Sequence, residues 1–161
     1  MKLMGIFLLL LVSAECFLAD ETDSSTCPEH WVDASLTGLG CLLFNSTKAY
    51  GWEEANNYCQ RDENASLVEI WTSIQLDFIR TELILLYHNG IHNSWWTSGT
   101  DLSREGEWYW GPSGTSVGDF VWGPNEPHGN TYNNCLKLYS TTFFGRDNAC
   151  TSAYLPICQK K

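Results

Sequence analysis

Apolar residues repeat at helical spacing in two stretches of the chain. The first runs from residue 51 to residue 61, where Trp52, Ala55 and Cys59 fall on one face of a helix. Two acidic side chains stand in the first turn, where the positive end of the helix dipole favours them: Glu53 and Glu54. The pattern predicts a helix over residues 51–61.

The second helix is predicted to begin near Thr72. Thr72 and Gln75 stand three residues apart, as in a capping box. The sequence His88-Asn89-Gly90 should end the helix. Five apolar side chains form its predicted buried face: Ile74, Phe78, Ile79, Leu83 and Leu86.

Short apolar segments separated by Gly, Asn, Ser and Pro are typical of short strands. They occupy residues 42–44, 95–96, 108–110, 120–122, 136–138 and 155–157. Residues 27–41 predict a small hairpin with Trp31 as its apolar residue, closed by a local disulfide. Together with the two helices, these segments indicate one α+β domain.

The start of the chain predicts a cleaved secretory signal at residues 1–19. A lysine precedes the apolar run of residues 6–12, and small residues follow it. Cleavage could follow Ala14, Cys16 or Ala19, and residues 20–26 form a short polar segment. The apolar run is too short to span a bilayer. We therefore expect a secreted, extracellular protein without membrane insertion.

Composition narrows the possible partners. The 161 residues suit one compact domain, and the formal charge of −10 is unchanged without residues 1–19, because Lys2 and Glu15 cancel. Such a chain has no electrostatic attraction to nucleic acid or anionic lipid. The eight tryptophans should mostly be buried. Of the seven cysteines, Cys16 lies at the edge of the signal, and the other six predict disulfides whose pairing stays open.

Candidate binding chemistry concentrates in residues 122–130 and in Asn133 and Asn134, just before Cys135. This stretch has two prolines, two glycines and many polar side chains, so it should be a surface loop within the irregular residues 111–134. The Glu126-Pro127 bond can adopt cis at modest cost. Clustered oxygen donors are what calcium requires, and an ordinary hydrophilic loop is the alternative.

Three other features have plainer interpretations. Asn45 and Asn64 begin N-glycosylation sequences, which matter only in an exported chain. His88 and His92 stand four apart but flank Asn89-Gly90, so they are read as loop histidines. No nucleophile motif is visible, and nothing supports a glycosidase pair of Glu126 and Asp147, so we expect no enzyme.

In their order along the chain, these residues resemble the C-type lectin-like domain. The resemblance covers residues 27–159. The segment Trp96-Thr97-Ser98-Gly99-Thr100-Asp101 resembles the corresponding sequence of single-domain secreted lectins of invertebrates. It rests on Cys27-Pro28, Trp31, Gly40-Cys41, Trp52-Glu53-Glu54-Ala55, Cys59, residues 65–68 and 95–101, Trp108, Trp110, Glu126-Pro127, Cys135, Cys150 and Pro156-Ile157-Cys158. It implies two helices, short antiparallel sheets, a long binding loop and three disulfides: Cys27–Cys41, Cys59–Cys158 and Cys135–Cys150.

The resemblance also implies a calcium ion in the long loop that sugar hydroxyls coordinate directly. Glu126 and Pro127 match the family's loop motif, while His128 replaces an asparagine and Asn133 replaces a second glutamate. The implied calcium ligands are Glu126, Asn133 and Asp147. Arg146 replaces an amide ligand, so the charge count predicts a weak calcium site or none. Three other amides could fill vacancies: Asn125, Asn130 and Asn134.

A secondary calcium site is implied at Asp101 and Glu105. Its other two carboxylate positions fall on Gly129 and Asn134, which leaves the site incomplete. The simpler interpretation is that Asp101 and Glu105 are exposed loop acids.

Two functional hypotheses follow. The first is a secreted carbohydrate-recognition protein for microbial or self glycans, as in innate immunity. In it, His128 and Arg146 hydrogen-bond or ion-pair with an acidic or unusual glycan, and an exposed Trp or Tyr132 stacks on a sugar face. The alternative is a calcium-independent lectin-like module that binds a protein, a mineral or an ice surface.

Overall fold

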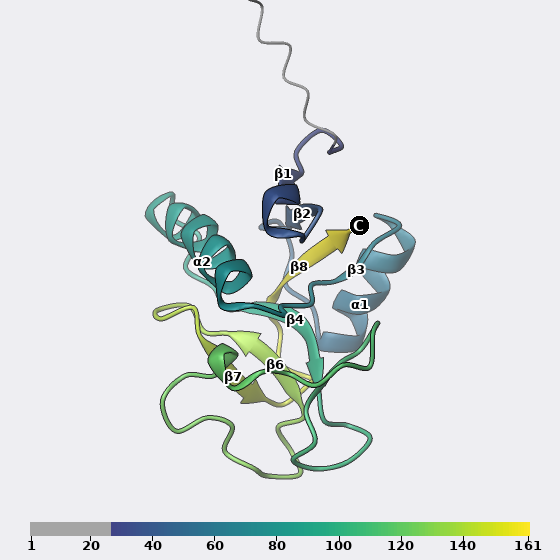
Figure 1. The fold of residues 1–161 in the computed structure, drawn as a ribbon, viewed down its shortest axis with the longest axis vertical. Helices are drawn as coiled ribbons and strands as arrows, with labels where there is room; N and C mark the ends of the chain where they lie inside the picture. The colour runs from purple at the N-terminus through teal and green to yellow at the C-terminus, as the bar shows by residue number, and fades with distance from the viewer. Residues whose placement is uncertain (1–26) are drawn as a thin grey trace, which may run out of the picture.

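The computed structural model describes residues 27–161, in which two α-helices pack around a mixed sheet (Figure 1). The elements are β1 (Val32–Asp33), η1 (Ser35–Thr37), β2 (Cys41–Phe44), α1 (Trp52–Arg61), β3 (Ser66–Leu67), α2 (Ser73–His88), β4 (Trp95–Thr100), β5 (Tyr109–Trp110), η2 (Asp119–Val121), β6 (Cys135–Leu138), β7 (Gly145–Asn148) and β8 (Leu155–Lys160). The signal peptide and the polar segment of residues 20–26 lie outside the described residues. No helix in residues 27–161 is long and apolar enough to cross a membrane.

Helix α1 occupies the range that its periodicity predicts. Ala55 and Cys59 are fully buried, and Trp52 donates its indole N–H to the Thr97 carbonyl at 2.7 Å. The disulfide between Cys59 and Cys158 then fastens this helix to β8. The α1 prediction is confirmed.

Helix α2 begins with the predicted cap. The Thr72 hydroxyl accepts from the Gln75 backbone N–H at 3.2 Å, while the Gln75 side chain accepts from Trp71 N at 2.8 Å rather than from Thr72. Ile79 and Leu83 are buried, whereas Ile74 is 70% exposed. Placing Ile74 on the buried face was wrong. Leu76 is buried instead, and a residue two positions away lies more than halfway round the helix.

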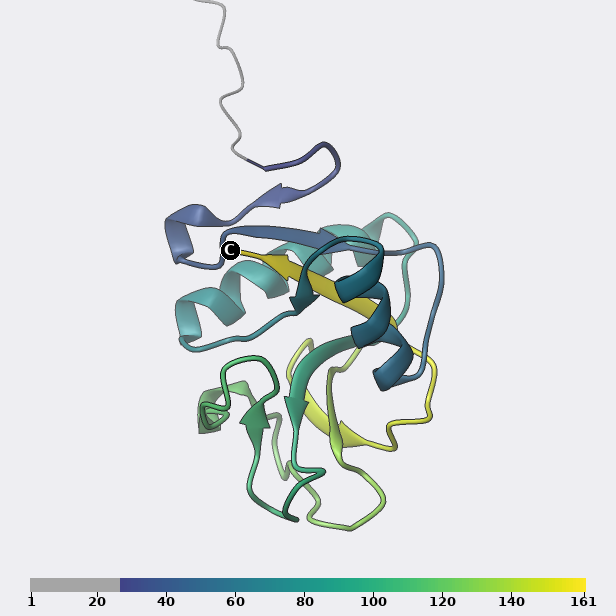
Figure 2. The same ribbon diagram turned by 90° about the vertical axis from the view of Figure 1, so that its right-hand side faces the viewer.

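The sheet runs in the order β1-β2-β8-β4-β6-β7, with β3 added to β8 and β5 added to β4. Within it, β4 and β8 are parallel, with Trp95 opposite Leu155, and the other paired strands are antiparallel. Figure 2 shows β8 running through the centre of the fold, beside β2. The expected sheets are thus present, with one parallel pair that the sequence did not indicate.

The prediction of a strand at residues 120–122 was wrong, because this segment forms the 3₁₀ helix η2. Val121 donates to the Gly118 carbonyl at 3.1 Å and is fully buried. Trp122 makes one isolated bridge to Gly145. The apolar run therefore reflects burial against the core and not continuous strand pairing.

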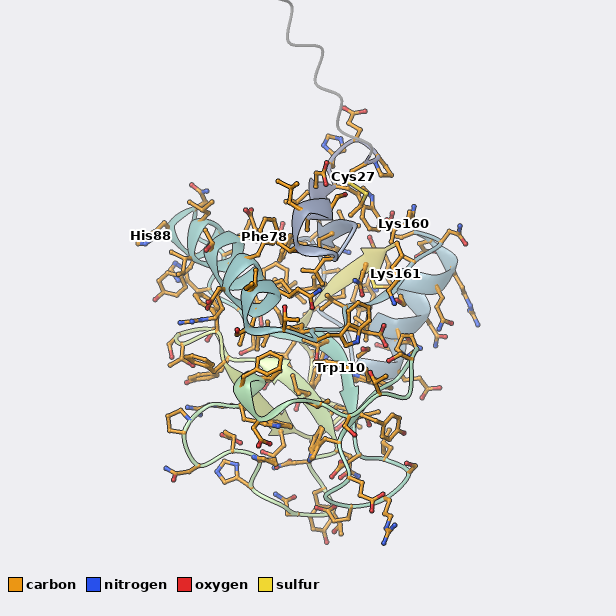
Figure 3. All side chains as sticks on the ribbon, in the orientation of Figure 1. Cys27, Phe78, His88, Trp110, Lys160 and Lys161 are labelled. Atoms are coloured by element: carbon orange, nitrogen blue, oxygen red, sulfur yellow. A yellow bond between two sulfur atoms is a disulfide. The ribbon has the colours of Figure 1, made fainter. Side chains whose placement is uncertain are left out.

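Tryptophans supply much of the core. Trp95, Trp96 and Trp110 are fully buried, and Trp108 is nearly so, while the other four are half-buried. Figure 3 places Trp110 within the body of the fold and His88 at the outer end of α2. The structure contains the three disulfides that the resemblance implies: Cys27–Cys41, Cys59–Cys158 and Cys135–Cys150.

Candidate functional site

The candidate site lies where the irregular loop of residues 122–134 meets strand β7. Gly123 N–H donates to the Gly145 carbonyl at 2.9 Å, which holds the start of the loop beside β7. Strand β7 pairs with β6, and the Cys135–Cys150 disulfide joins the start of β6 to the segment after β7. The Glu126-Pro127 peptide bond is cis. Contacts of the loop with β7 bring Glu126 and His128 to Asp147.

His128 stands between two buried carboxylates. Its ring Nδ1 lies 2.9 Å from Glu126 Oε2 and 3.0 Å from Asp147 Oδ1. Its backbone N–H donates to Asp147 Oδ2 at 3.0 Å. The acid side chains of Glu126 and Asp147 are 3% and 1% exposed, whereas that of His128 is 60% exposed.

Arg146 adds a guanidinium group to this cluster. Its Nε lies 3.5 Å from Glu126 Oε1, and its side chain is 40% exposed. The guanidinium lies over the Tyr139 ring, 4.0 Å from the centroid. Four of the five predicted ligand-binding residues therefore come together. The two acids, Glu126 and Asp147, are buried, and the two nitrogen-bearing side chains, His128 and Arg146, are partly exposed.

The surroundings of the cluster raise the pKa values of Glu126 and His128. Burial raises the pKa of the Glu126 carboxyl, as does its hydrogen bond with Asp147, against the lowering effect of His128 and Arg146. The hydrogen bond to Asp147 raises the pKa of His128, and the charge of Glu126 adds to that shift. The imidazole therefore holds its proton more tightly than a free histidine.

The loop asparagines do not join this cluster. Within residues 27–161, no contact links the Asn133 side chain to Glu126 or Asp147, and Asn133 N–H donates to the Asn130 carbonyl at 3.2 Å. Asn130 Oδ1 accepts from Tyr132 N at 3.1 Å, and Asn134 Nδ2 donates to the Thr131 carbonyl at 3.4 Å. These amides mainly stabilise the turn of their own loop.

Asp101 is buried, so the interpretation of Asp101 as an exposed loop acid was wrong. Its Oδ2 accepts from Gly106 N–H at 2.9 Å, which closes a turn that leaves Glu105 exposed. Burial raises the pKa of Asp101; burial and the negative charges of Asp101 and Asp147 raise that of Glu105. Two buried oxygens have no hydrogen-bond partner there, Asp101 Oδ1 and Asn134 Oδ1.

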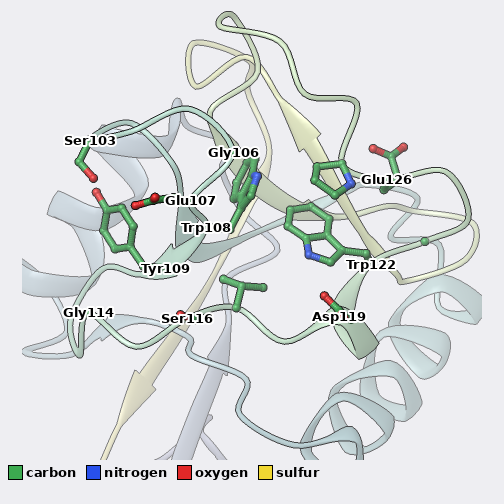
Figure 4. A pocket seen from close by; sticks show the side chains of 13 residues that line it. Ser103, Gly106, Glu107, Trp108, Tyr109, Gly114, Ser116, Asp119, Trp122 and Glu126 are labelled. Carbon is green, nitrogen blue, oxygen red and sulfur yellow. The ribbon is translucent and has the colours of Figure 1, made fainter.

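A cavity of about 730 Å³ opens beside the loop and includes Glu126 in its lining (Figure 4). Trp108 and Trp122 meet edge to face at 4.8 Å between ring centroids, and Tyr109 stands on another side of the cavity. Asp119 adds a carboxylate. Sequence reasoning placed Trp122 in the candidate binding stretch but did not select Trp108, Tyr109 or Asp119 for a site, although Asp119 lies within the irregular residues 111–134.

Comparisons with known proteins agree with this architecture. The family described as the lectin C-type domain matches residues 48–160. The carbohydrate-recognition domain of human scavenger receptor C-type lectin is 27% identical with a TM-score of 0.70, covering 84% of this chain and 99% of that one. A Ca²⁺-dependent type II antifreeze protein, in its Ca²⁺-free form, is 26% identical with a TM-score of 0.68, covering 84% and 100%.

Human lithostathine is 25% identical with a TM-score of 0.70, covering 84% of this chain and 99% of that one. A search of curated protein sequences finds no match. The family match spans more than half of the chain, and the fold is similar to that of the solved structures named above. The chain belongs to the C-type lectin domain family.

Proposed function

We propose that this protein is an extracellular glycan-binding module whose binding face is the loop cluster of Glu126, His128, Arg146 and Asp147. The observation that carries the proposal is the position of two partly exposed nitrogen-bearing side chains, His128 and Arg146, beside two buried carboxylates where the long loop meets β7. The likeness to a carbohydrate-recognition domain of a scavenger receptor supports it.

The four side chains differ in exposure. His128 and Arg146 are partly exposed and carry N–H groups, while the buried carboxylates of Glu126 and Asp147 contact them and fix their positions. N–H groups on cations form their strongest hydrogen bonds with anionic oxygens. We therefore expect glycans that carry a carboxylate or another acidic group to bind best.

The neighbouring cavity offers a second contact area. Tyr109 and Trp122 line it and are half-buried, so each retains some accessible ring surface. An aromatic face can stack on the apolar side of a sugar ring. A glycan longer than one residue could occupy the cluster and the cavity together.

Calcium does not fit the principal position in the long loop, the one implied at Glu126, Asn133 and Asp147. Calcium takes oxygen ligands, whereas the Glu126 and Asp147 oxygens face His128 nitrogens and the Arg146 guanidinium. No contact of Asn133 adds an oxygen there within residues 27–161. The proposed glycan contact therefore uses these side chains directly.

The secondary position fits calcium better. The unpartnered oxygens of Asp101 and Asn134 are suitable ligands, and Glu105 lies close enough for the Asp101 charge to raise its pKa. Asp101 N–H donates to the Asn134 carbonyl at 3.3 Å, so the two residues are neighbours. Calcium bound by Asp101, Glu105 and Asn134 would supply positive charge that steadies the turn of residues 101–106.

The test is binding of neutral and acidic glycans to the oxidised protein, in calcium and in chelator. Acidic glycans should bind in both conditions, and Arg146→Ala should weaken binding roughly tenfold or more, the usual cost of losing a hydrogen bond to a charged group. Arg61→Ala, which removes an exposed arginine at the end of α1, is the matched control. Absence of glycan binding, or equal binding by Arg146→Ala, would overturn the proposal.

A second candidate is a calcium-independent module that binds a protein, a mineral or an ice surface. The internal pairing of the cluster charges favours it, because paired groups have less to offer a sugar. The likeness to an antifreeze protein is consistent with it. Thermal hysteresis or mineral adsorption without glycan binding would support this function over the first.

A further inference from the structure

Three potential metal ligands face one another at the meeting point of the loop and β7. They are one imidazole nitrogen of His128 and one carboxylate oxygen each from Glu126 and Asp147, all within 4.8 Å of one another. Zinc and related transition metals bind this mixture of nitrogen and oxygen ligands. Calcium, in contrast, selects oxygen ligands alone.

The other oxygen of each carboxylate is already held by the protein. Arg146 Nε lies 3.5 Å from Glu126 Oε1, and the His128 backbone N–H donates to Asp147 Oδ2 at 3.0 Å. Glu126 Oε2 and Asp147 Oδ1 are left facing His128 Nδ1. Contacts of this kind to the outer atoms of metal ligands orient them and are a regular feature of protein metal sites.

Glu126 Oε2 is buried and has an ion-pair contact in place of a well-formed hydrogen bond. The Glu126 side chain is 3% exposed, and its Oε2 lies 2.9 Å from His128 Nδ1, which is hydrogen-bonded to Asp147 Oδ1. A buried carboxylate oxygen without a hydrogen bond is costly. A metal ion between Glu126 and His128 would satisfy it.

The two separations from the His128 ring nitrogen require little adjustment. Zinc bonds of about 2.0 to 2.2 Å in tetrahedral geometry place neighbouring ligand atoms roughly 3.3 Å apart. The two separations from Nδ1 are 2.9 and 3.0 Å, so the ring must move outward by a few tenths of an ångström. The His128 side chain is 60% exposed and can make that movement, and its open side leaves a fourth position for water or another ligand.

We propose that Glu126, His128 and Asp147 form a binding site for a zinc-type transition metal ion rather than for calcium. Arg146 reduces the affinity of the site without blocking it. It lies on the Oε1 side of Glu126, and its guanidinium stacks over Tyr139. The site does not depend on the proposed glycan binding, because metal binding is measured directly.

The experiment titrates the oxidised protein with Zn²⁺ alone and, separately, with Ca²⁺, by calorimetry and by thermal midpoint. One Zn²⁺ per chain should bind and raise the midpoint, as any ligand of the folded state does. Co²⁺ in place of Zn²⁺ should give the visible absorption of a tetrahedral nitrogen–oxygen site. His128→Asn should weaken Zn²⁺ at least roughly 10- to 100-fold, the loss known for outer contacts of metal ligands.

The chain has four histidines, which provide matched controls. His30→Asn and the double change His88→Asn/His92→Asn remove exposed imidazoles elsewhere and should leave Zn²⁺ binding unchanged. The thermal midpoint of His128→Asn in chelator establishes that it folds; if it does not, His128→Gln replaces it. Zn²⁺ binding that survives both changes at position 128, or the absence of millimolar Zn²⁺ binding, would overturn the proposal, even if glycans bind.

Discussion

Asp147 of β7 accepts two contacts from His128 of the loop, one from the backbone amide and one from the ring, each 3.0 Å long. The Asp147 side chain is 1% exposed, so both contacts lie where water competes little. This double contact fastens the loop to the sheet through one carboxylate. It also makes the loop sensitive to the protonation of one ring.

The pH dependence of stability should reveal this contact. The hydrogen bond to Asp147 and the charge of Glu126 raise the pKa of His128, so its contribution is fully present below pH ~6.5 and is lost as pH rises through the folded pKa. Burial also raises the pKa of Glu126. The stability contribution of this group therefore likewise falls as pH rises above ~4.5 through its folded pKa. In chelator, the thermal midpoint of the protein minus that of His128→Asn should fall as pH rises above about 6.5.

Nuclear magnetic resonance of the imidazole tests the same relationship directly. The His128 pKa should lie above ~6.5 and move back toward that value in Asp147→Asn. Asp77→Asn, which removes an exposed acid paired with Arg80 on α2, is the control and should have no effect. A His128 pKa that is equal in Asp147→Asn and in the unmodified protein would contradict the assigned contact.

Calcium should act through the secondary position. Millimolar calcium should raise the thermal midpoint, and Asp101→Asn should remove the rise, because Asp101 supplies the buried charged oxygen. His128→Asn should leave this rise intact. Adding both amides that the family resemblance implies, in His128→Asn/Arg146→Asn, should increase the response to calcium, since two cations are replaced by oxygen ligands.

Comparison of these variants in calcium and in chelator separates the two positions. A calcium response that vanishes in His128→Asn but survives in Asp101→Asn would place the ion in the principal loop instead. A double variant with no added response would mean that the cations are not what excludes calcium.

Gly99 allows β4 and β6 to approach closely. A Cβ added there would lie 2.9 Å from Leu136 Cβ and 3.3 Å from Trp110 Cζ3. Gly99→Ala should therefore destabilise the fold by about 1 to 3 kcal/mol through overpacking. Gly111→Ala, whose nearest contact would be 3.4 Å, is the control for added size, and denaturant unfolding is the measurement. Equal effects of the two changes would refute the packing argument.

The two predicted glycosylation sequences differ in the folded chain. Asn45 is 7% exposed and its Oδ1 accepts from the Thr47 hydroxyl at 2.6 Å, whereas Asn64 is exposed. A glycan is joined to the asparagine side-chain nitrogen, and at Asn45 it would have to leave a residue that is only 7% exposed. Peptide mass spectrometry of the protein secreted from eukaryotic cells should therefore find a glycan on Asn64 and none on Asn45. A fully occupied Asn45 in the folded protein would contradict this interpretation.

Local sequence rules predicted the features that depend on neighbouring residues. The periodicity of Ala55 and Cys59 indicated the first helix, and Thr72 with Gln75 indicated the start of the second. The same rules failed where contacts are distant. Val121 is apolar because it packs in the core, and nothing local distinguishes that from a strand. The parallel pairing of Trp95 with Leu155 joins segments too far apart for local rules.

The candidate site was predictable as a place more than as an arrangement. Glu126, His128, Arg146 and Asp147 could be selected from the sequence. The contacts of the loop residues with Arg146 and Asp147 join positions about twenty residues apart, which only the fold establishes. Asn133 was selected by its resemblance to a family motif position, yet the turn uses its backbone. The burial of Asp101 was not predicted, because it depends on the turn of residues 101–106 that closes over the side chain.

Both ends of the described chain meet at Cys41. Its disulfide joins it to Cys27, and its backbone pairs with Lys160. Figures 1 and 2 place this meeting point at one pole of the molecule and the long loop at the opposite pole. A linker at either end therefore leaves the loop pole free. Copies tethered at this pole would keep their loops unobstructed, and the gain in avidity would be set by linker length.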